Sequence, residues 1–237
     1  MTPVLEARDL KKGYRRGQRK ITAADQVSFC LYPGEILGLM GPSGSGKSTV
    51  AKLLTGLTEA DEGEIFVDGK KISYRKKGQR KEIYRRMQMV FQSPAASFDP
   101  RRTLGDGIGE SLRNAGISGK TLDERVKELL RSCGLSEEFV RRYPHEVSGG
   151  QCQRAAIARA LAVNPKILIC DEATSALDVM AQRQILELLA SLRETRGISI
   201  LFICHNPAVV EAFCDRFLVM EQGRVIGEEA VPTAAVP

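Results

Sequence analysis

The stretch GPSGSGKST, residues 41–49, has the residue types and spacing of a phosphate-binding loop, G-x-x-x-x-G-K-[ST]. Its glycines let backbone N–H groups turn inward around phosphate oxygens. Lys47 supplies a positive charge to the terminal phosphates, and the Ser48 hydroxyl is placed to reach Mg²⁺. The residues that the loop predicts for nucleotide binding are Gly41, Pro42, Ser43, Gly44, Ser45, Gly46, Lys47, Ser48 and Thr49.

A pair of acids follows a short apolar run in KILICDE, residues 166–172. Asp171 comes at the end of a predicted buried strand, where P-loop enzymes place a carboxylate that holds Mg²⁺ directly or through water. Glu172 projects to the other side of the strand end and is free to take a proton from an attacking water. A protein that only binds a nucleotide does not need this second acid, so the pair favours hydrolysis.

A second glycine-rich segment, HEVSGGQCQR, stands about a hundred residues after the loop. Ser148 lies three residues before Gln151, which is the spacing of a capping box at a helix start. Gly149 and Gly150 leave that helix start bare, so its unpaired N–H groups and positive dipole end can approach an anion. The chain therefore contains two places suited to a phosphate.

The elements around the loop are predicted from apolar periodicity and turn residues. Strands are expected at 4–10, 26–33 and 35–41, and the last of them runs directly into the loop. The helix after the loop has an apolar stripe of Val50, Leu53, Leu54 and Leu57, and Gly56 is placed to end it. Hairpins are expected through two turn dipeptides, Asp68-Gly69 and Gln222-Gly223.

The second half of the chain reads as helices followed by a βαβ unit. The pattern is helical from about 103 to 163. The runs KILIC and ISILFIC are short, continuous and rich in β-branched residues, as central strands of a parallel sheet are. Between them an apolar stripe of Ile185, Leu188, Leu189 and Leu192 predicts a helix, so the order strand, helix, strand indicates a parallel sheet.

Composition is that of an ordinary globular protein, with 43% hydrophobic and 27% charged residues. The longest apolar run, 198–204, is too short to span a bilayer, and the N-terminus lacks a secretory leader, so a cytosolic location is expected. The six cysteines form no C-x-x-C pair and are interpreted as small buried hydrophobes.

The net charge of +6 is concentrated in two basic stretches, 8–20 and 70–86. Such stretches can face nucleic acid, anionic lipid headgroups or nucleotide phosphates, or they can be solvated faces without a dedicated partner. The stretch 70–86 leads into the segment around Gln92, which the family resemblance described below places on the membrane-facing side. We therefore expect residues 70–86 to lie near anionic headgroups. Neutralising Lys76, Lys77 and Arg80 should then reduce the association of the assembled complex with vesicles.

Taken together, the loop, the strand-end acids and the second glycine-rich helix start resemble an ATP-binding cassette (ABC) ATPase over essentially all 237 residues. The resemblance implies that Tyr14 stacks on adenine, although a tyrosine in a basic stretch can also simply be exposed. It implies that Gln92 touches Mg²⁺ and the attacking water. It also implies that His205 contacts the γ-phosphate, although by itself this histidine would be interpreted as capping a strand.

The resemblance also covers two motifs that act between subunits. Residues 147–151, VSGGQ, match the family's signature with Val in place of the usual Leu, and Ser175, Ala176, Leu177 and Asp178 match the D-loop, a dimer contact. The resemblance implies that the signature of one copy caps the γ-phosphate bound by a second copy. In this chain the signature residues are Ser148, Gly149, Gly150 and Gln151. Two departures from the pattern, Asn206 and Cys170, are small in volume and are not expected to abolish hydrolysis.

The predicted fold is α/β: a P-loop NTPase core of the ABC type with a mainly parallel sheet, a small antiparallel β subdomain and an inserted α-helical subdomain. Residues 1–237 are expected to form a single ABC ATPase domain. Its ATP-binding core covers about 1–92 and 164–237, and the helical signature subdomain covers about 93–163. The expected catalytic residues are Lys47, Gln92, Glu172 and His205, and the expected Mg²⁺ ligands are Ser48, Gln92 and Asp171.

Three classes of cassette ATPase compete for the function. DNA-repair and chromosome-organising ATPases insert long coiled coils or zinc modules between loop and signature, and translation factors usually carry two cassettes; neither pattern is found here. Transport is therefore favoured, with a soluble ABC ATPase acting on nucleic acid or the ribosome as the alternative. The expected partners are a second ATPase subunit, identical or different, two membrane permease subunits and, indirectly, an extracytoplasmic binding protein, with no nucleic acid. The expected place is the cytoplasmic face of the membrane.

The expected cargo rests on FQSPAASFDPRRTLGDGI, residues 91–108, which resembles bacterial importers of di- and oligopeptides, nickel and metal chelates. Peptide-importing members generally carry a longer C-terminal extension than this chain shows. Because this chain stops soon after its last predicted hairpin, the nickel or metallophore branch is favoured.

Overall fold

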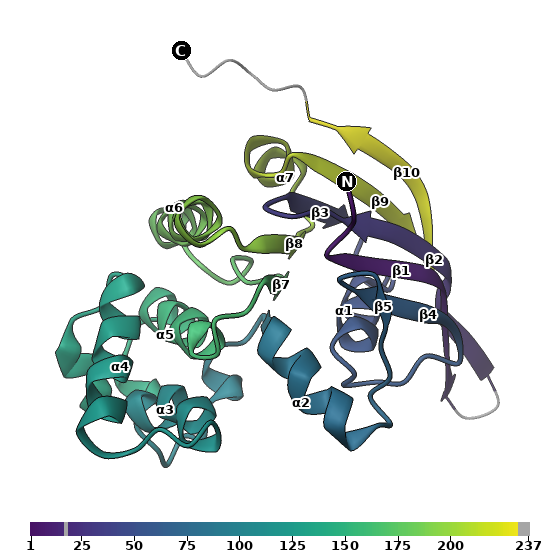
Figure 1. Cartoon of the computed structure of the whole chain (residues 1–237). Coiled ribbons are helices and arrows are strands. Elements are labelled where there is room, and N and C mark those ends of the chain that lie inside the picture. Colours follow the sequence, from purple (N-terminus) through teal and green to yellow (C-terminus); the bar gives the residue numbers. More distant parts are fainter. Residues whose placement is uncertain (17–18, 232–237) are drawn as a thin grey trace. The chain divides into compact units, whose positions relative to one another are not determined.

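The computed structural model describes residues 1–16 and 19–231, which form two compact units (Figure 1). Of the described residues, the core unit comprises 1–16, 19–89, 166–172 and 193–231, and the helical unit comprises 90–165 and 173–192. The second unit thus includes 173–192 beside the predicted insert of 93–163. These units are defined by compactness, whereas the predicted boundaries at about 92 and 164 separate an ATP-binding core from a signature subdomain. Those boundaries stay a prediction.

The core unit contains a six-stranded sheet of order β10-β9-β3-β8-β7-β6. Strands β3, β7 and β8 are parallel neighbours, and β7 and β8 are buried along their whole length because both of their faces are apolar. The predicted parallel sheet is therefore confirmed. The bounds are β3 Ile36–Met40, β6 Met87–Val90, β7 Ile167–Asp171, β8 Ser199–Ile203, β9 Arg216–Glu221 and β10 Arg224–Ala230.

A second, four-stranded antiparallel sheet has the order β2-β1-β4-β5. Its strands are β1 Leu5–Arg16, β2 Arg19–Leu31, β4 Glu62–Val67 and β5 Lys70–Lys71. Strand β1 is longer than the predicted 4–10. Both predicted hairpin turns are confirmed, since Asp68, Gly69, Gln222 and Gly223 all have φ between 47° and 86°, the left-handed conformation that such turns require.

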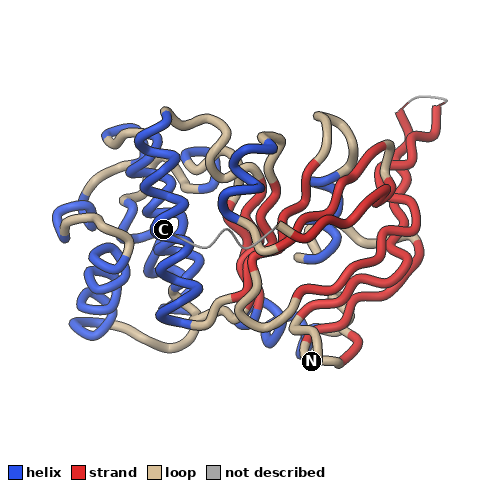
Figure 2. Tube along the Cα trace, turned by 90° about the horizontal axis from the view of Figure 1, so that it is seen from above, coloured by secondary structure: helices blue, strands red, loops and turns tan. Residues whose placement is uncertain are grey.

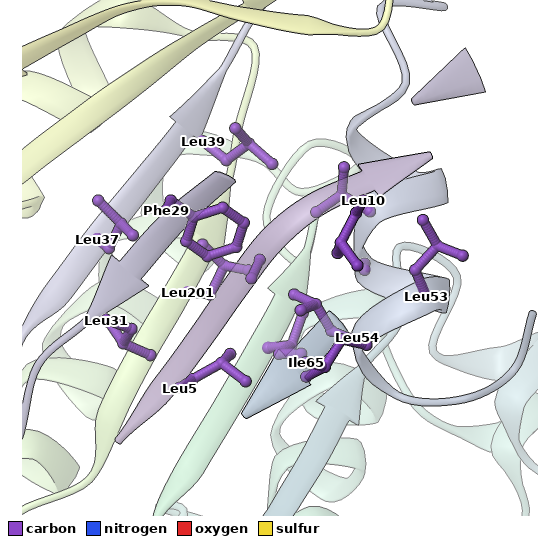
Figure 3. Packing of buried hydrophobic residues seen from close by; sticks show 14 of the residues in the cluster. Leu5, Leu10, Phe29, Leu31, Leu37, Leu39, Leu53, Leu54, Ile65 and Leu201 are labelled. Carbon is purple, nitrogen blue, oxygen red and sulfur yellow. The ribbon is translucent and has the colours of Figure 1, made fainter. Parts of the chain in front are cut away.

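Aliphatic side chains from both sheets and from helix α1, Lys47–Leu54, form one hydrophobic core (Figure 3). Leu5, Leu39 and Leu54 are fully buried in it, and each contributes about 2 kcal/mol of transfer free energy. Helix α1 ends before Gly56, which has φ 71°, as predicted. Leu57 lies after that end and is exposed, so its predicted place in the helix stripe was wrong.

The helical unit is built around three helices, α3 Leu104–Asn114, α4 Gly119–Ser132 and α5 Gly149–Leu161. They lie together in Figure 1 and are among the blue helices of Figure 2. Each presents apolar side chains to the others, including Ile108, Leu130 and Ile157. Arg159, near the end of α5, stacks its guanidinium over the Phe98 ring and donates to the Ser97 carbonyl. Short turns of 3-10 helix cover Ala95–Ser97, Glu137–Arg141 and Pro144–Glu146.

Three further helices are α2 Lys77–Arg86, α6 Val179–Arg196 and α7 Pro207–Phe213. Helix α6 confirms the predicted stripe, with Ile185, Leu189 and Leu192 buried. Helix α2 occupies the second basic stretch and was not predicted, because Ile83 is its one buried apolar side chain among the residues described there. A single buried residue gives no periodic signal.

Five of the six cysteines are buried and Cys30 is half-buried, which agrees with their interpretation as small hydrophobic residues. Within the described part of the chain, no helix has the length and apolar character needed to cross a bilayer.

Candidate nucleotide site

The carboxyl ends of β3, β7 and β8 meet at one edge of the six-stranded sheet. The predicted phosphate-loop, metal and proton-transfer residues of the core unit follow these ends, whereas Tyr14 does not. The register pairs Leu39 with Ile203 and Ile203 with Asp171, so the three strands stop level with one another. The phosphate loop follows β3, the acid pair follows β7 and His205 follows β8. Ligands of open parallel sheets bind at this edge.

The phosphate loop has the conformation of an anion cradle. Gly46, the residue before α1, has φ 108°, and a Cβ there would lie 2.0 Å from the carbonyl oxygen of Ala23, so no other residue fits without a shift of the backbone. The start of α1 has no side-chain cap, which leaves its first N–H groups to a ligand. The turn between β9 and β10 supports the loop, because the Gly223 N–H donates to the Ser45 carbonyl at 2.9 Å.

The loop's polar side chains fit a phosphate ligand. Lys47 is 4% exposed, and its ammonium donates to the carbonyls of Gly41 and Pro42 at 2.8 and 2.9 Å, so its charge is held inside the loop. The buried hydroxyl of Ser45 has no hydrogen-bond partner in the structure. A buried polar atom without a partner costs about 1–3 kcal/mol, which a bound phosphate oxygen would offset.

Ser48 and Asp171 meet although they stand 123 positions apart: the Ser48 hydroxyl donates to Asp171 Oδ1 at 3.0 Å. Burial raises the pKa of the Asp171 carboxyl, and the hydrogen bond from Ser48 acts in the opposite direction. A hydroxyl and a carboxylate side by side at the phosphate loop are oxygen ligands of the kind that Mg²⁺ prefers.

Glu172 adopts φ 48°, a left-handed conformation that is uncommon outside glycine and is found often at functional sites. Its N–H donates to the Ile203 carbonyl at 3.0 Å, which ties it to the end of β8. Glu172 Oε2 lies 3.9 Å from His205 Nδ1, and the Glu172 side chain is 15% exposed. The structure thus brings two of the four predicted catalytic side chains, those of Glu172 and His205, close together.

Tyr14 lies on the antiparallel sheet of the same unit, in the part of β1 that pairs with β2, opposite Ile21. The side chain is 40% exposed. It is available for stacking from a strand, in the part of β1 that extends beyond the predicted 4–10.

The signature residues lie in the helical unit, where Ser148 caps α5 as predicted. The Ser148 hydroxyl accepts from the Gln151 N–H at 3.3 Å, and Gln151 Oε1 accepts from the Ser148 N–H at 2.9 Å, which completes a capping box. Ser148 and Gly149 are exposed, while Gly150 and Gln151 are half-buried.

The predicted D-loop and Gln92 belong to the helical unit too. Ser175, Ala176 and Asp178 are exposed, and Leu177 is half-buried. Gln92 Nε2 lies 3.5 Å from the Ser175 hydroxyl, at the limit of a hydrogen bond. Asp178 has a structural task that the sequence pattern did not indicate: its carboxylate accepts from the Ala181 N–H at 2.9 Å and caps the start of α6.

A family model described as "ABC transporter" matches residues 24–175, more than half of the chain. The chain belongs to the ABC transporter family. The resemblance stated from the motifs and the ABC-type P-loop fold are both confirmed.

Two curated ABC relatives are each 47% identical to this chain. One is the glutathione import ATP-binding protein GsiA of Escherichia coli (strain K12), aligned over 99% of this chain and 38% of its own length. The other is the oligopeptide transport ATP-binding protein OppF of Haemophilus influenzae, aligned over 87% of this chain and 63% of its own length. The chain therefore spans less than two thirds of either relative.

Solved ABC structures resemble this chain over almost all of it. A dimeric post-hydrolysis state of the ATP-binding cassette MJ0796, bound to ADP and Pi, has a TM-score of 0.87 at 32% identity and covers 97% of this chain and 100% of its own. CbiO1 of Clostridium perfringens, part of the ABC transporter complex cbiONQ, has a TM-score of 0.85 at 28% identity, covering 97% and 89%. The chain is thus an ABC-type ATP-binding domain.

Proposed function

We propose that this chain binds and hydrolyses ATP for an ABC importer, and that each of its active sites is completed by a second cassette. The observation that carries the proposal is the group at the sheet edge: Lys47 inside the loop, Ser48 bonded to Asp171 at 3.0 Å, and Glu172 Oε2 3.9 Å from His205 Nδ1. These side chains have the chemistry that phosphoryl transfer to water requires.

Each side chain has a separate role in this proposal. The loop's N–H groups and Lys47 would hold the phosphates, and Ser48 and Asp171 would hold Mg²⁺, which would supply positive charge for phosphoryl transfer. Glu172 accepts the proton of the attacking water, a contribution of about 10²–10⁴ in rate. His205 positions Glu172 and contacts the γ-phosphate. For Gln92, in the helical unit, a role at Mg²⁺ and the attacking water stays a prediction.

A second copy would supply the remaining groups. In the proposal, the exposed Ser148 and Gly149 of one cassette face the γ-phosphate held by the other, and Ser175 to Asp178 contact the partner. Phosphoryl transfer depends mainly on positioning and charge stabilisation, which a half-site open to water does not supply in full. ATP then drives dimerisation and hydrolysis releases it. The dimeric MJ0796 cassette supports this arrangement.

Peptide import is the transport function that the relatives favour, since one is named for glutathione import and the other for oligopeptide transport. Nickel or metal chelates are not retained as the cargo, because the position where this chain ends has no physical connection with cargo and neither relative is named for nickel. The proposed partners are a second ATPase subunit, two permease subunits and an extracytoplasmic binding protein. The proposed location is the cytoplasmic face of the membrane.

Glu172→Gln tests the core of the proposal. The amide retains the shape of the carboxyl but cannot accept a proton, so turnover should fall by a factor of about 10² or more. ATP should still bind, and the variant should accumulate as an ATP-stabilised dimer in size-exclusion chromatography. Glu211→Gln, an exposed acid of α7, is the matched control and should behave as the parent chain does. Unchanged turnover in Glu172→Gln would place the general base elsewhere.

Uptake measurements test the cargo. Cells that lack this chain should lose import of a labelled short peptide and retain nickel uptake. Loss of nickel uptake alone would refute the peptide assignment without affecting the hydrolysis proposal.

A further inference from the structure

The part of β1 that carries Tyr14 extends beyond the strand that supports the rest of β1. Strand β4 pairs with β1 from Leu5 up to Lys11, whose partner is Glu62. Past that point the register gives β1 a single described neighbour, β2, up to Arg16. A two-stranded ribbon is marginally stable in water by itself. Tyr14 is therefore on a projecting ribbon and needs an additional support to hold one position.

The ladder is also irregular where the ribbon begins. The register between β1 and β2 shifts between Leu10 and Lys12 and again between Lys12 and Gly13. Such bulges redirect a strand and leave some of its backbone groups without a ladder partner. The direction of the ribbon is thus set at Lys12 and Gly13, immediately before Tyr14.

Asp61, the residue before β4, supplies the missing support. Its N–H donates to the Lys11 carbonyl, its Oδ2 accepts from the Gly13 N–H, and its Oδ1 accepts from the Lys12 ammonium, each at 2.8 Å. The carboxylate extends the pairing of β4 with β1 by one hydrogen bond. Oδ2 accepts from the Gly13 N–H, as a backbone carbonyl of β4 would if the strand continued. Bonds of this charge-assisted kind are stronger than neutral ones.

The contact with Lys12 reaches the tyrosine ring as well. Lys12 Nζ lies over the Tyr14 ring at 5.8 Å from its centroid, within the range of a cation–π interaction. The Lys12 side chain is 16% exposed and is held there by Asp61. Asp61 therefore acts on Tyr14 by two routes, through the backbone of Gly13 and through the cation over the ring.

We propose that Asp61 is a positioning residue for nucleotide recognition, which fixes the ribbon so that Tyr14 can stack on adenine. This inference rests on the proposed ATP binding and on the adenine-stacking role that the family resemblance implies for Tyr14. Asp61 touches neither the base nor the phosphates; its effect passes through Lys12, Gly13 and Tyr14. Its removal should weaken binding of the base and leave binding of the phosphates unchanged.

The experiment compares two ligands, Mg-ATP and Mg-tripolyphosphate, which has the phosphates without the base. In the full chain, Asp61→Ala should weaken ATP binding about three- to tenfold, the range of one aromatic stacking contact, and raise KM to a similar extent. Tripolyphosphate affinity and kcat at saturating ATP should stay within about twofold, since the loop is untouched. Asp61→Asn retains an acceptor for the Gly13 N–H but loses the charge opposite Lys12. Its ATP affinity should therefore lie between that of the parent chain and that of Asp61→Ala.

Glu59→Ala is the matched control. Glu59 stands two residues before Asp61 in the same connection, forms its ion pair with Arg75 and makes no hydrogen bond to the described residues of β1. It should change neither ligand's affinity. Thermal unfolding of each variant separates a local effect from a loss of fold, and an equal loss of ATP and tripolyphosphate affinity in Asp61→Ala would overturn the proposal.

Tyr14→Ala separates this inference from the stacking role on which it rests. If Tyr14→Ala weakens ATP binding and Asp61→Ala does not, stacking stands and the positioning role is refuted. If Tyr14→Ala has no effect, stacking fails and the positioning role fails with it. When both act, the double variant should bind ATP no more weakly than Tyr14→Ala alone. Additive losses would mean that Asp61 acts through another route.

Discussion

Two glycine-rich helix starts in this chain look alike in sequence and differ in structure. The start of α1 follows Gly46, which has φ 108° and provides no side-chain cap. The start of α5 follows Ser148, whose hydroxyl and partner Gln151 satisfy two backbone N–H groups reciprocally. Gly149 and Gly150 belong to α5 itself and have ordinary helical backbone.

The difference indicates two ways of using a helix terminus. The α1 terminus leaves its N–H groups to a ligand and surrounds them with a buried lysine and an unpaired buried hydroxyl, so it is suited to hold phosphates within one chain. The α5 terminus is already capped by its own side chains, and Ser148 and Gly149 are exposed there. In the proposed dimer it closes over a phosphate that another subunit holds.

Mixing two inactive variants gives the largest expected effect. Lys47→Ala disables the phosphate loop and Ser148→Arg blocks the capped terminus, so each variant alone should lose nearly all turnover. A mixed dimer contains one site in which both termini are intact. An equal mixture should therefore recover about a quarter of the parent rate, because about half of the dimers are mixed and each has one working site. If the parent chain turns over ATP by itself, no recovery in ATPase assays of the mixture would mean that each chain completes its own site.

Alanine at the two kinds of glycine should separate fold from function. In Gly46→Ala the new Cβ would lie 2.0 Å from a carbonyl oxygen at a positive φ, so the loop must distort and ATP binding should be lost. In Gly149→Ala the nearest atom, Leu177 Cδ2, is 3.5 Å away, and alanine is the better helix former.

The Gly149→Ala variant should thus unfold at the same or a higher temperature. Its ATPase rate should fall about tenfold, because a methyl group would stand on the surface that we propose meets the partner. If this variant hydrolyses ATP at the normal rate, activity does not require a glycine at position 149. Thermal unfolding measures the effect on stability, and ATPase assays measure the effect on turnover.

Two helix caps provide the smallest and most specific comparison. Ser148→Ala and Thr103→Ala each remove a side-chain acceptor at a helix start, since Thr103 accepts from the Asp106 N–H at 3.1 Å at the beginning of α3. Each should lower the free energy of unfolding by about 1 kcal/mol. Only Ser148→Ala should reduce turnover in the dimer. Equal reductions in both variants would attribute the effect to helix stability alone.

The features that the sequence predicted well are those whose cause is local. The phosphate loop, the capping box at Ser148 and the hairpin turns at Asp68-Gly69 and Gln222-Gly223 each depend on a few adjacent residues with distinctive backbone preferences. The parallel strands β7 and β8 were predictable because burial on both faces demands a continuous apolar run.

The features that the sequence did not predict depend on distant or unpatterned residues. Helix α2 has too few apolar residues to produce a periodic signal, and β1 extends to Arg16 through a polar stretch. The support of the loop by Gly223 and the support of the Tyr14 ribbon by Asp61 join residues far apart in the chain. No spacing rule relates such positions.

By itself the sequence determined the kinds of groups available: a loop that binds phosphates, a carboxylate pair after a strand and a capped helix start. The tertiary structure decided which of them meet. The level ends of β3, β7 and β8 bring Ser48 within hydrogen-bond distance of Asp171 across 123 positions, and the left-handed turn at Glu172 accompanies its approach to His205. The reason is that strand register is set by packing over the whole sheet, whereas a turn or cap is set by the few residues that form it.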